Sequence, residues 1–159
     1  MGKLYSIRST QQLPTGIEQA WEFFSNPGNL QLITPQYMNF KIISQLHTNG
    51  IYAGQLITYK VKPVLGIPMK WVTIISQVKE HEYFIDVQQS GPYSFWHHEH
   101  RFVANDGGTE LIDIVHYKLP LGWLGRLANN LFVQRQLQDI FSYRRQRVEE
   151  IFPADIVNK

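Results

Sequence analysis

The stretch PMKWVTIISQVKEHEYFIDVQQSGPYSFWHHEHRFVANDGGTELIDIVHYKL, residues 68–119, decides the fold. It contains four runs rich in Ile, Val, Thr, Tyr and Trp, separated by the short turn sequences KEHE, SGPY and ANDGG. Residues of these types favour strands, and short connections between them favour antiparallel hairpins. The stretch therefore predicts four consecutive antiparallel strands at 68–78, 83–89, 94–103 and 109–119.

The sequence on the N-terminal side adds strands and a helix. Two more strand-like runs, FKIISQL and GQLITYKV, occupy 40–46 and 54–61, and a short extended pattern begins the chain. Between them, 17–24 has apolar residues at helical spacing, which predicts a helix with Thr15 as its N-cap and Glu18 completing a capping box. A second short helical turn is expected at 29–33.

The sequence after Pro120 is helical in pattern for about 30 residues, with apolar residues near i, i+4 spacing. These are Leu127, Leu131, Leu137, Phe141, Val148 and Phe152. The whole order predicts an α+β fold. A seven-stranded antiparallel sheet curves around a long C-terminal helix, with one or two short helices after the first strand.

Composition narrows the class of protein. A chain of 159 residues with 43% hydrophobic content predicts one domain spanning 1–159. The chain has no cysteine, which excludes disulfides, thiolate zinc sites and cysteine nucleophiles. The start of the chain lacks the apolar core of a signal peptide, and no run of 18 apolar residues occurs. We therefore expect a cytoplasmic protein without an integral membrane segment.

The charge pattern argues against nucleic-acid binding. The formal net charge is only +2, and the one arginine cluster is Arg144, Arg145 and Arg147, with Arg135 upstream. Acidic residues are interleaved with these arginines, so we interpret the cluster as a solvated helix face. No glycine-rich phosphate loop and no nucleophile elbow is present, and we expect no cofactor.

Four segments carry a resemblance to a known superfamily. They are IEQAWEFFSNPGNLQLITP at 17–35, AGQLITYKVKPVLGIPMKWVT at 53–73, GPYSFWHHEHRF at 91–102 and YKLPLGWLGRLANNLFVQRQLQDIF at 117–141. The chain resembles the START-like, birch-pollen-allergen-like (SRPBCC) superfamily, in a bacterial subfamily sometimes labelled polyketide cyclase/dehydrase-like. This resemblance implies the helix-grip fold, with a ligand cavity between the sheet and the C-terminal helix. Members of the superfamily range from lipid and hormone carriers to aromatase/cyclases.

Strand parity divides the histidines of SFWHHEHRF, residues 94–102. Alternate residues of a strand share a face, so Trp96, His98 and His100 point one way, whereas Glu99 and Arg101 point the other. Charged side chains are costly to bury without partners. We therefore expect the two histidines to face inward.

The short turns also predict the register of the neighbouring strands. The turn in SGPY places Asp86 opposite His98, Phe84 opposite His100 and Gln88 opposite Trp96. The turn in ANDGG places Asp113 opposite His100, Val115 opposite His98 and Tyr117 opposite Trp96. Two histidines and two carboxylates would then share the inner face. Hydrophobicity alone favours the opposite orientation of 83–89, with Ile85 and Val87 inward. An outward apolar pair could be covered by the partner in a homodimer.

Three interpretations of these histidines remain open. His98 and His100 could form a satisfied polar network with Asp86 and Asp113, which we favour. The same groups could act in acid–base catalysis, with His98, His100 and Asp113 as the candidate catalytic residues. Two histidines and one carboxylate could also bind a metal ion, although we expect none.

The function that we expect is binding of a small hydrophobic molecule, lipid-like or polyketide-like, in the cavity. The predicted ligand-binding residues are Tyr59, Trp71, Thr73, Asp86, Gln88, Trp96, His98, His100, Asp113 and Tyr117. One alternative is a cyclase or dehydratase that uses the histidines and aspartates as acid and base. Another is a protein-interaction module that presents the outer face of the sheet.

Overall fold

The computed structural model describes residues 2–46, 50–64 and 66–154, and within them a single antiparallel sheet. The strands of this sheet lie in the order β1-β7-β6-β5-β4-β3-β2. Their bounds are β1 Tyr5–Leu13, β2 Lys41–Ile42, β3 Leu56–Val64, β4 Ile67–Lys79, β5 Tyr83–Ser90, β6 Phe95–Asn105 and β7 Gly108–Lys118. The four strands predicted from 68–119 are therefore confirmed, and β1 pairs with the last of them.

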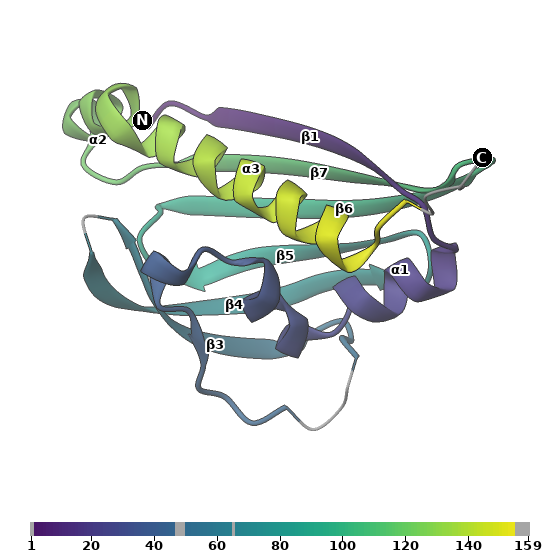
Figure 1. Cartoon of the computed structure of the whole chain (residues 1–159). Coiled ribbons are helices and arrows are strands. Elements are labelled where there is room, and N and C mark those ends of the chain that lie inside the picture. The colour runs from purple at the N-terminus through teal and green to yellow at the C-terminus, as the bar shows by residue number, and fades with distance from the viewer. Residues whose placement is uncertain (1, 47–49, 65, 155–159) are drawn as a thin grey trace.

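Helices cover one face of the sheet (Figure 1). The C-terminal helical segment crosses it diagonally, and the short helices cover the part beside β3–β5 (Figure 1). The bounds are α1 Ile17–Phe24, the 3-10 helices η1 Pro27–Ile33 and η2 Gln36–Met38, then α2 Gly122–Ala128, the π-helical turn η3 Asn129–Val133 and α3 Gln134–Ile151. This is the predicted α+β helix-grip arrangement.

Two local predictions need correction. The N-cap of α1 is Gly16 rather than Thr15, and no side chain caps it. Thr15 Oγ1 donates instead to the Gln19 side chain, so the capping box with Glu18 does not form. The predicted strand 40–46 is reduced to β2. The Ile43 N–H still bonds to the Thr58 carbonyl (2.9 Å), but the Thr58 N–H bonds to the Ser44 hydroxyl (3.1 Å) rather than to the backbone.

The predicted register of the histidine-bearing strand is confirmed on both sides. Asp86 pairs with His98 across β5 and β6, and His100 pairs with Asp113 across β6 and β7. Glu99 and Arg101 form an ion pair on the opposite face. Ile85 also lies on that outer face, yet its exposed fraction is only 8% within the isolated chain. It therefore needs no dimer partner to cover it.

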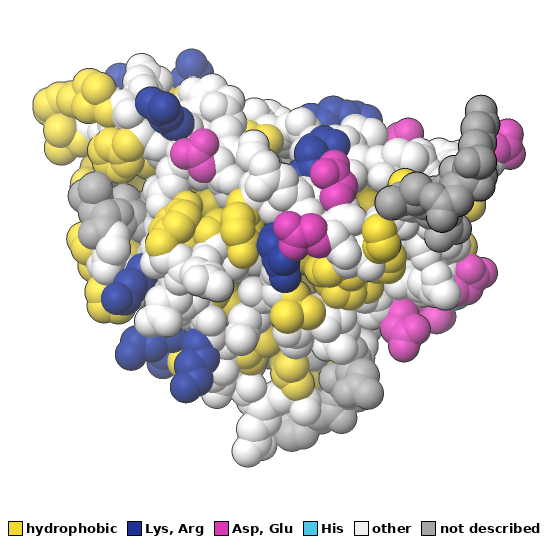
Figure 2. Space-filling model, viewed as in Figure 1, with side chains coloured by type: hydrophobic (Ala, Val, Ile, Leu, Met, Phe, Trp, Pro, Cys, Tyr) yellow, Lys and Arg dark blue, Asp and Glu magenta, His cyan; other side chains and the backbone are white. Residues whose placement is uncertain are grey.

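The C-terminal segment is amphipathic over α3 but not over α2. Leu137 and Val148 are buried against the sheet, whereas Leu127 and Leu131 are 49% and 68% exposed. The expectation that these last two share the buried face is wrong, because α2 lies past the ends of β6 and β7 (Figure 1). Hydrophobic side chains gather at this end of the molecule (Figure 2). They are Leu121, Trp123, Leu124, Leu127 and Leu131.

Among the described residues, no helix combines the length and the apolar character that crossing a lipid bilayer requires.

Candidate ligand-binding site

A cavity of about 190 Å³ lies between the sheet, α3 and the short helices. For comparison, an engineered apolar cavity of about 150 Å³ is large enough to bind benzene. Strands β3 and β4 supply one wall, which includes Ile57, Tyr59, Val61, Trp71, Thr73 and Ile75. Leu137, Ile140, Phe141 and Arg144 of α3 supply the facing wall, at the three- and four-residue spacing of one helix face. The space is therefore lined by elements distant in sequence.

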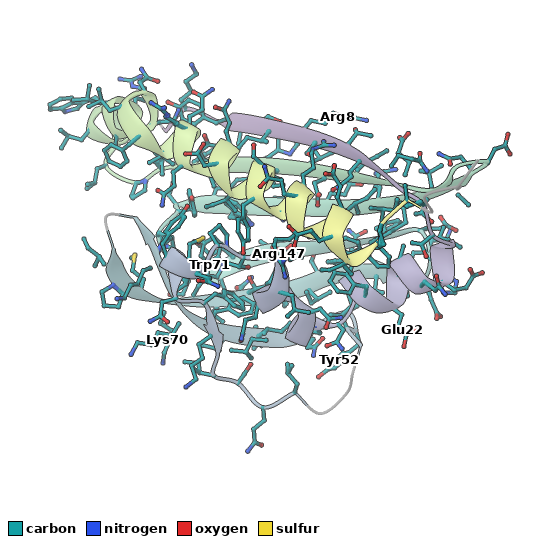
Figure 3. All side chains as sticks on the ribbon, in the orientation of Figure 1. Arg8, Glu22, Tyr52, Lys70, Trp71 and Arg147 are labelled. Atoms are coloured by element: carbon teal, nitrogen blue, oxygen red, sulfur yellow. The ribbon has the colours of Figure 1, made fainter. Side chains whose placement is uncertain are left out.

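Seven of the ten predicted ligand-binding residues line this cavity. They are Tyr59, Trp71, Thr73, Asp86, Trp96, His98 and His100. Trp71, labelled in Figure 3, lies between the sheet and the C-terminal helix, and its indole Nε1 donates to Thr73 Oγ1 (3.2 Å). Its ring packs against Tyr93 and Trp96 at centroid distances of 5.6 and 5.3 Å. These rings form an aromatic end of the cavity.

The structure places the other three residues elsewhere. The Gln88 amide donates to the Tyr93 carbonyl (2.7 Å) and so fixes the turn between β5 and β6. Tyr117 donates its hydroxyl to Asn129 Oδ1 (2.8 Å) of the π-helical turn, away from the cavity. Asp113 contacts three residues of the cavity wall, His98, His100 and Arg144, but does not line the cavity itself. None of the three is among the lining residues.

Two imidazoles and two carboxylates form a buried cluster, which we call the His–Asp cluster: Asp86, His98, His100 and Asp113. His98 Nε2 and His100 Nδ1 each lie 2.9 Å from Asp113 Oδ1. On the other side, His100 Nε2 lies 2.9 Å from Asp86 Oδ2, whereas His98 Nδ1 is 3.5 Å from the same oxygen. The imidazole rings overlap with centroids 3.7 Å apart. Each carboxylate is thus shared by both rings.

This geometry favours protons on both ring nitrogens of His100 but on only one ring nitrogen of His98. Both nitrogens of His100 lie within 2.9 Å of a carboxylate, so its two N–H groups both have anionic neighbours. Burial by itself would lower the pKa of His100, but the contacts with Asp113 and Asp86 outweigh burial and raise the pKa above 6.5. Burial, together with the neighbouring His100 charge, lowers the pKa of His98. His98 is then neutral and donates from Nε2.

The two carboxylates remain ionised despite their burial. Burial alone would raise the pKa of Asp86, yet the hydrogen bond from His100 and the nearby charges of His100 and Arg144 lower it. For Asp113, the Arg144 guanidinium and the two histidines overcome the effect of burial and hold the pKa well below 3.8. When His100 carries both ring protons, it and Arg144 balance the charges of the two carboxylates.

Tyr59 adds a neutral phenol to the cavity wall. Burial, and then the negative charge of Asp86, raise the pKa of its hydroxyl far above 10. Its ring packs against Phe40 at a centroid distance of 4.8 Å. The hydroxyl therefore keeps its proton at every physiological pH.

Asp86, His98 and His100 have the right atoms for a metal ion. One ligand atom from each lies within 4.8 Å of the others, and two imidazoles with one carboxylate suit a divalent transition metal. However, the His100 and Asp86 atoms already contact each other at 2.9 Å. The positive Arg144 guanidinium, 3.9 Å from Asp113, also opposes a second cation. The cluster is therefore better matched to a proton than to a metal.

Sequence reasoning missed the most informative residue of the site. Arg144 was assigned to a solvated helix face, but its side chain is only 12% exposed and lines the cavity. Arg145 and Arg147 do lie at the surface, where they donate to the carbonyls of Thr10 (2.6 Å) and Leu32 (3.2 Å). The seven-residue interval from Leu137, two helical turns, could have placed Arg144 on the buried face.

Residues of the short helices were also missed as part of the site. They lie in the segment between β1 and β2 and close the cavity opposite β3–β5. They are Phe23, Phe24, Asn26, Pro27, Asn29, Leu30, Ile33, Thr34 and Met38. The pairing of a helix with a particular part of a sheet has no local sequence signal, so only the assembled fold reveals this wall.

Comparison with known proteins identifies the fold. No family model matches the chain, and no curated protein sequence matches it. A crystal structure of a protein from Chromobacterium violaceum is 12% identical, with a TM-score of 0.68 over 94% of this chain and 99% of the other. A protein of unknown function from Staphylococcus aureus is also 12% identical, with a TM-score of 0.68 over 94% and 96%. The similarity shows a shared fold.

A third structure contains this fold within a longer chain. The nucleoside-diphosphate sugar epimerase from Corynebacterium glutamicum is 22% identical, with a TM-score of 0.63. The match covers 91% of the present chain but 28% of the epimerase. The fold therefore also occurs as one part of a larger bacterial protein.

Proposed function

We propose that this chain, as one START-like domain, binds a small and largely apolar molecule in the cavity between the sheet and α3. One observation carries the proposal: a mostly apolar cavity of about 190 Å³ has a convergent set of buried polar groups at one place in its wall. Ligand sites are commonly apolar spaces with a few positioned polar groups. The superfamily resemblance of the sequence supports the same function.

Binding without turnover is the first choice, because a hydrogen bond to a carboxylate holds each histidine of the His–Asp cluster in place. Three of its four nitrogen–carboxylate contacts are 2.9 Å long. His98 Nδ1 is 3.5 Å from Asp86, and His100 Nδ1 contacts Asp113 without a hydrogen bond to it. A network of this kind holds its groups in place and offers the ligand a few polar contacts.

Acid–base catalysis is the second candidate, and that same His98 nitrogen favours it as a free base in the cavity wall. A His98→Gln variant distinguishes the two functions, with a β-ketoester as the probe. If the variant binds the β-ketoester as tightly as the wild type but no longer converts it to product, the result favours an enzyme. No conversion by the wild-type protein would favour binding alone.

Native mass spectrometry of the purified protein tests the proposed function. We expect a population heavier than the bare chain by the mass of an apolar small molecule, released on unfolding. Ile57→Phe, which adds volume inside the cavity, should reduce this population, while Ile67→Phe at an exposed position should leave it unchanged. Folding of both variants is checked by circular dichroism. A bare chain in every preparation, with no uptake of added octanoate, would contradict the proposal.

A further inference from the structure

Arg144 lines the cavity, and its guanidinium pairs with the Asp113 carboxylate only at 3.9 Å, beyond hydrogen-bond distance. Its Nε is buried and has no hydrogen-bond partner among the described residues. Its neighbours are Asp113, whose Oδ1 is 3.9 Å from Nη1, and the ring of Phe24, 5.7 Å from the guanidinium carbon. A buried donor without an acceptor is costly, more so when it is charged. An acceptor is therefore expected from inside the cavity.

We propose that the ligand carries a carboxylate and that Arg144 binds this group. The inference rests on the proposed function and names the class of its ligand: an apolar monocarboxylic acid. The planar fork of guanidinium N–H groups matches the two oxygens of a carboxylate, and such charge-assisted pairs are stronger than neutral hydrogen bonds. A single carboxylate could satisfy two of the donors that have no partner.

The cavity gives the apolar part of such a ligand a defined place. Leu137, Phe141 and Arg144 line it from successive turns of α3. Seven residues of helix separate the first from the last, a rise of about 10 Å. Trp71 packs with the Leu137 end of this line, whereas Phe24 of α1 lies at the Arg144 end. A chain of about eight carbons spans this distance when extended.

Charge balance adds a second consequence. Asp86 and Asp113 supply two negative charges. Arg144 supplies one positive charge, and His100, which contacts a carboxylate through each ring nitrogen, supplies a second when both nitrogens carry protons. A bound carboxylate would leave the buried site with one net negative charge, which is unfavourable. His98 has the remaining free nitrogen, so binding is accompanied by uptake of a proton there. The titratable groups in contact with His98 are Asp86 from β5, His100 from β6 and Asp113 from β7, whereas Tyr59 from β3 and Arg144 from α3 line the same cavity.

Isothermal titration calorimetry with octanoate and 1-octanol tests the inference, since the two probes share an alkyl chain and differ in the head group. We expect octanoate to bind roughly 10- to 100-fold more tightly than octanol. Arg144→Gln should remove this preference, and Arg144→Lys should restore part of it. Arg145→Gln, which changes an exposed neighbour, should leave the preference intact. Equal binding of the two probes, or a preference that survives Arg144→Gln, would overturn the inference.

Titrations in buffers of different ionisation enthalpy measure the coupled proton. At pH 7.5 we expect uptake of about one proton per octanoate in the wild type and almost none in His98→Gln. Tight octanoate binding without proton uptake would contradict the role given to His98. If both probes bind equally, the apolar cavity still functions and only the carboxylate assignment fails. If neither probe binds, the proposed function itself fails.

Discussion

At the scale of single residues, Asp113 is the group on which most of the His–Asp cluster depends. It lies 2.9 Å from both imidazoles and 3.9 Å from Arg144, and it is almost fully buried. Removing its charge leaves an imidazolium and a guanidinium close together without an anion between them. Breaking a buried ionic cluster in this way is far more costly than losing a surface pair.

We therefore predict that Asp113→Asn lowers the free energy of unfolding by about 3–5 kcal/mol. The measurement is urea unfolding followed by circular dichroism at pH 7. Asp139→Asn on the exposed side of α3 is the matched control and should change stability by less than about 0.5 kcal/mol. Similar effects of the two substitutions would mean that the buried network is not formed.

Tyr117 gives a prediction in which structure and sequence disagree. The sequence places its hydroxyl at the ligand, but the structure directs it to Asn129. Tyr117→Phe should cost about 1–3 kcal/mol, because the buried amide oxygen loses its donor. The same variant should bind octanoate as tightly as the wild type. A large loss of affinity with unchanged stability would instead support the sequence-based role.

At the scale of elements, the two parts of the C-terminal segment should respond differently to mutation. Leu137 of α3 is buried against the sheet, whereas Leu131 of the preceding turn is largely exposed. We expect Leu137→Ala to destabilise the protein by about 2–5 kcal/mol, and Leu131→Ala by less than about 0.5 kcal/mol. Thermal unfolding of both variants measures this. Comparable losses would show that the preceding turn packs more tightly than the structure indicates.

The β-strands explain why much of the site could be predicted from sequence. The side-chain period of a strand is two, and a short turn fixes the register of a hairpin, so placing Asp86 beside His98 needs only local information. The same reasoning overcame the misleading hydrophobicity of Ile85, which lies on the outer face. Most of the polar wall of the cavity was therefore accessible from the residues alone.

The helical wall was not accessible in the same way. Which residues of a helix are buried depends on where the sheet ends beneath it. For this reason Leu131 is exposed while Leu137 is buried. Arg144 looked like a surface residue because acidic residues and other arginines surround it in sequence. Its burial follows from tertiary packing, which the charge pattern does not report.

At the scale of the whole molecule, the His–Asp cluster should make stability depend on pH around neutrality. Below pH 6.5, His98 takes up a proton more readily in the unfolded chain than in the fold, where its pKa is lowered. The free energy of unfolding therefore falls as the pH falls. Above 6.5 the folded His100 keeps a proton that the unfolded chain has lost, so its contribution disappears as pH rises through the raised pKa. The two effects together predict a maximum of stability near pH 6.5.

Urea unfolding between pH 2 and pH 9 measures this dependence. Below about pH 4 the lowered pKa of Asp113 adds a further loss, because the unfolded chain takes up protons first. His98→Gln should flatten the acid side between pH 6.5 and pH 5 while leaving the alkaline side unchanged. A wild-type profile that keeps rising from pH 6.5 to pH 9 would contradict the assignment of the proton to His100.

The central claim, that the cavity binds an apolar ligand, is tested most directly by the indole N–H signals of the four tryptophans. Trp71 and Trp96 line the cavity, whereas Trp123 is exposed on α2 and serves as an internal control. Titration of the ¹⁵N-labelled protein with octanoate should shift the Trp71 and Trp96 signals in a saturable way and leave Trp123 unmoved. A response confined to Trp123, or none at saturating octanoate, would contradict the account.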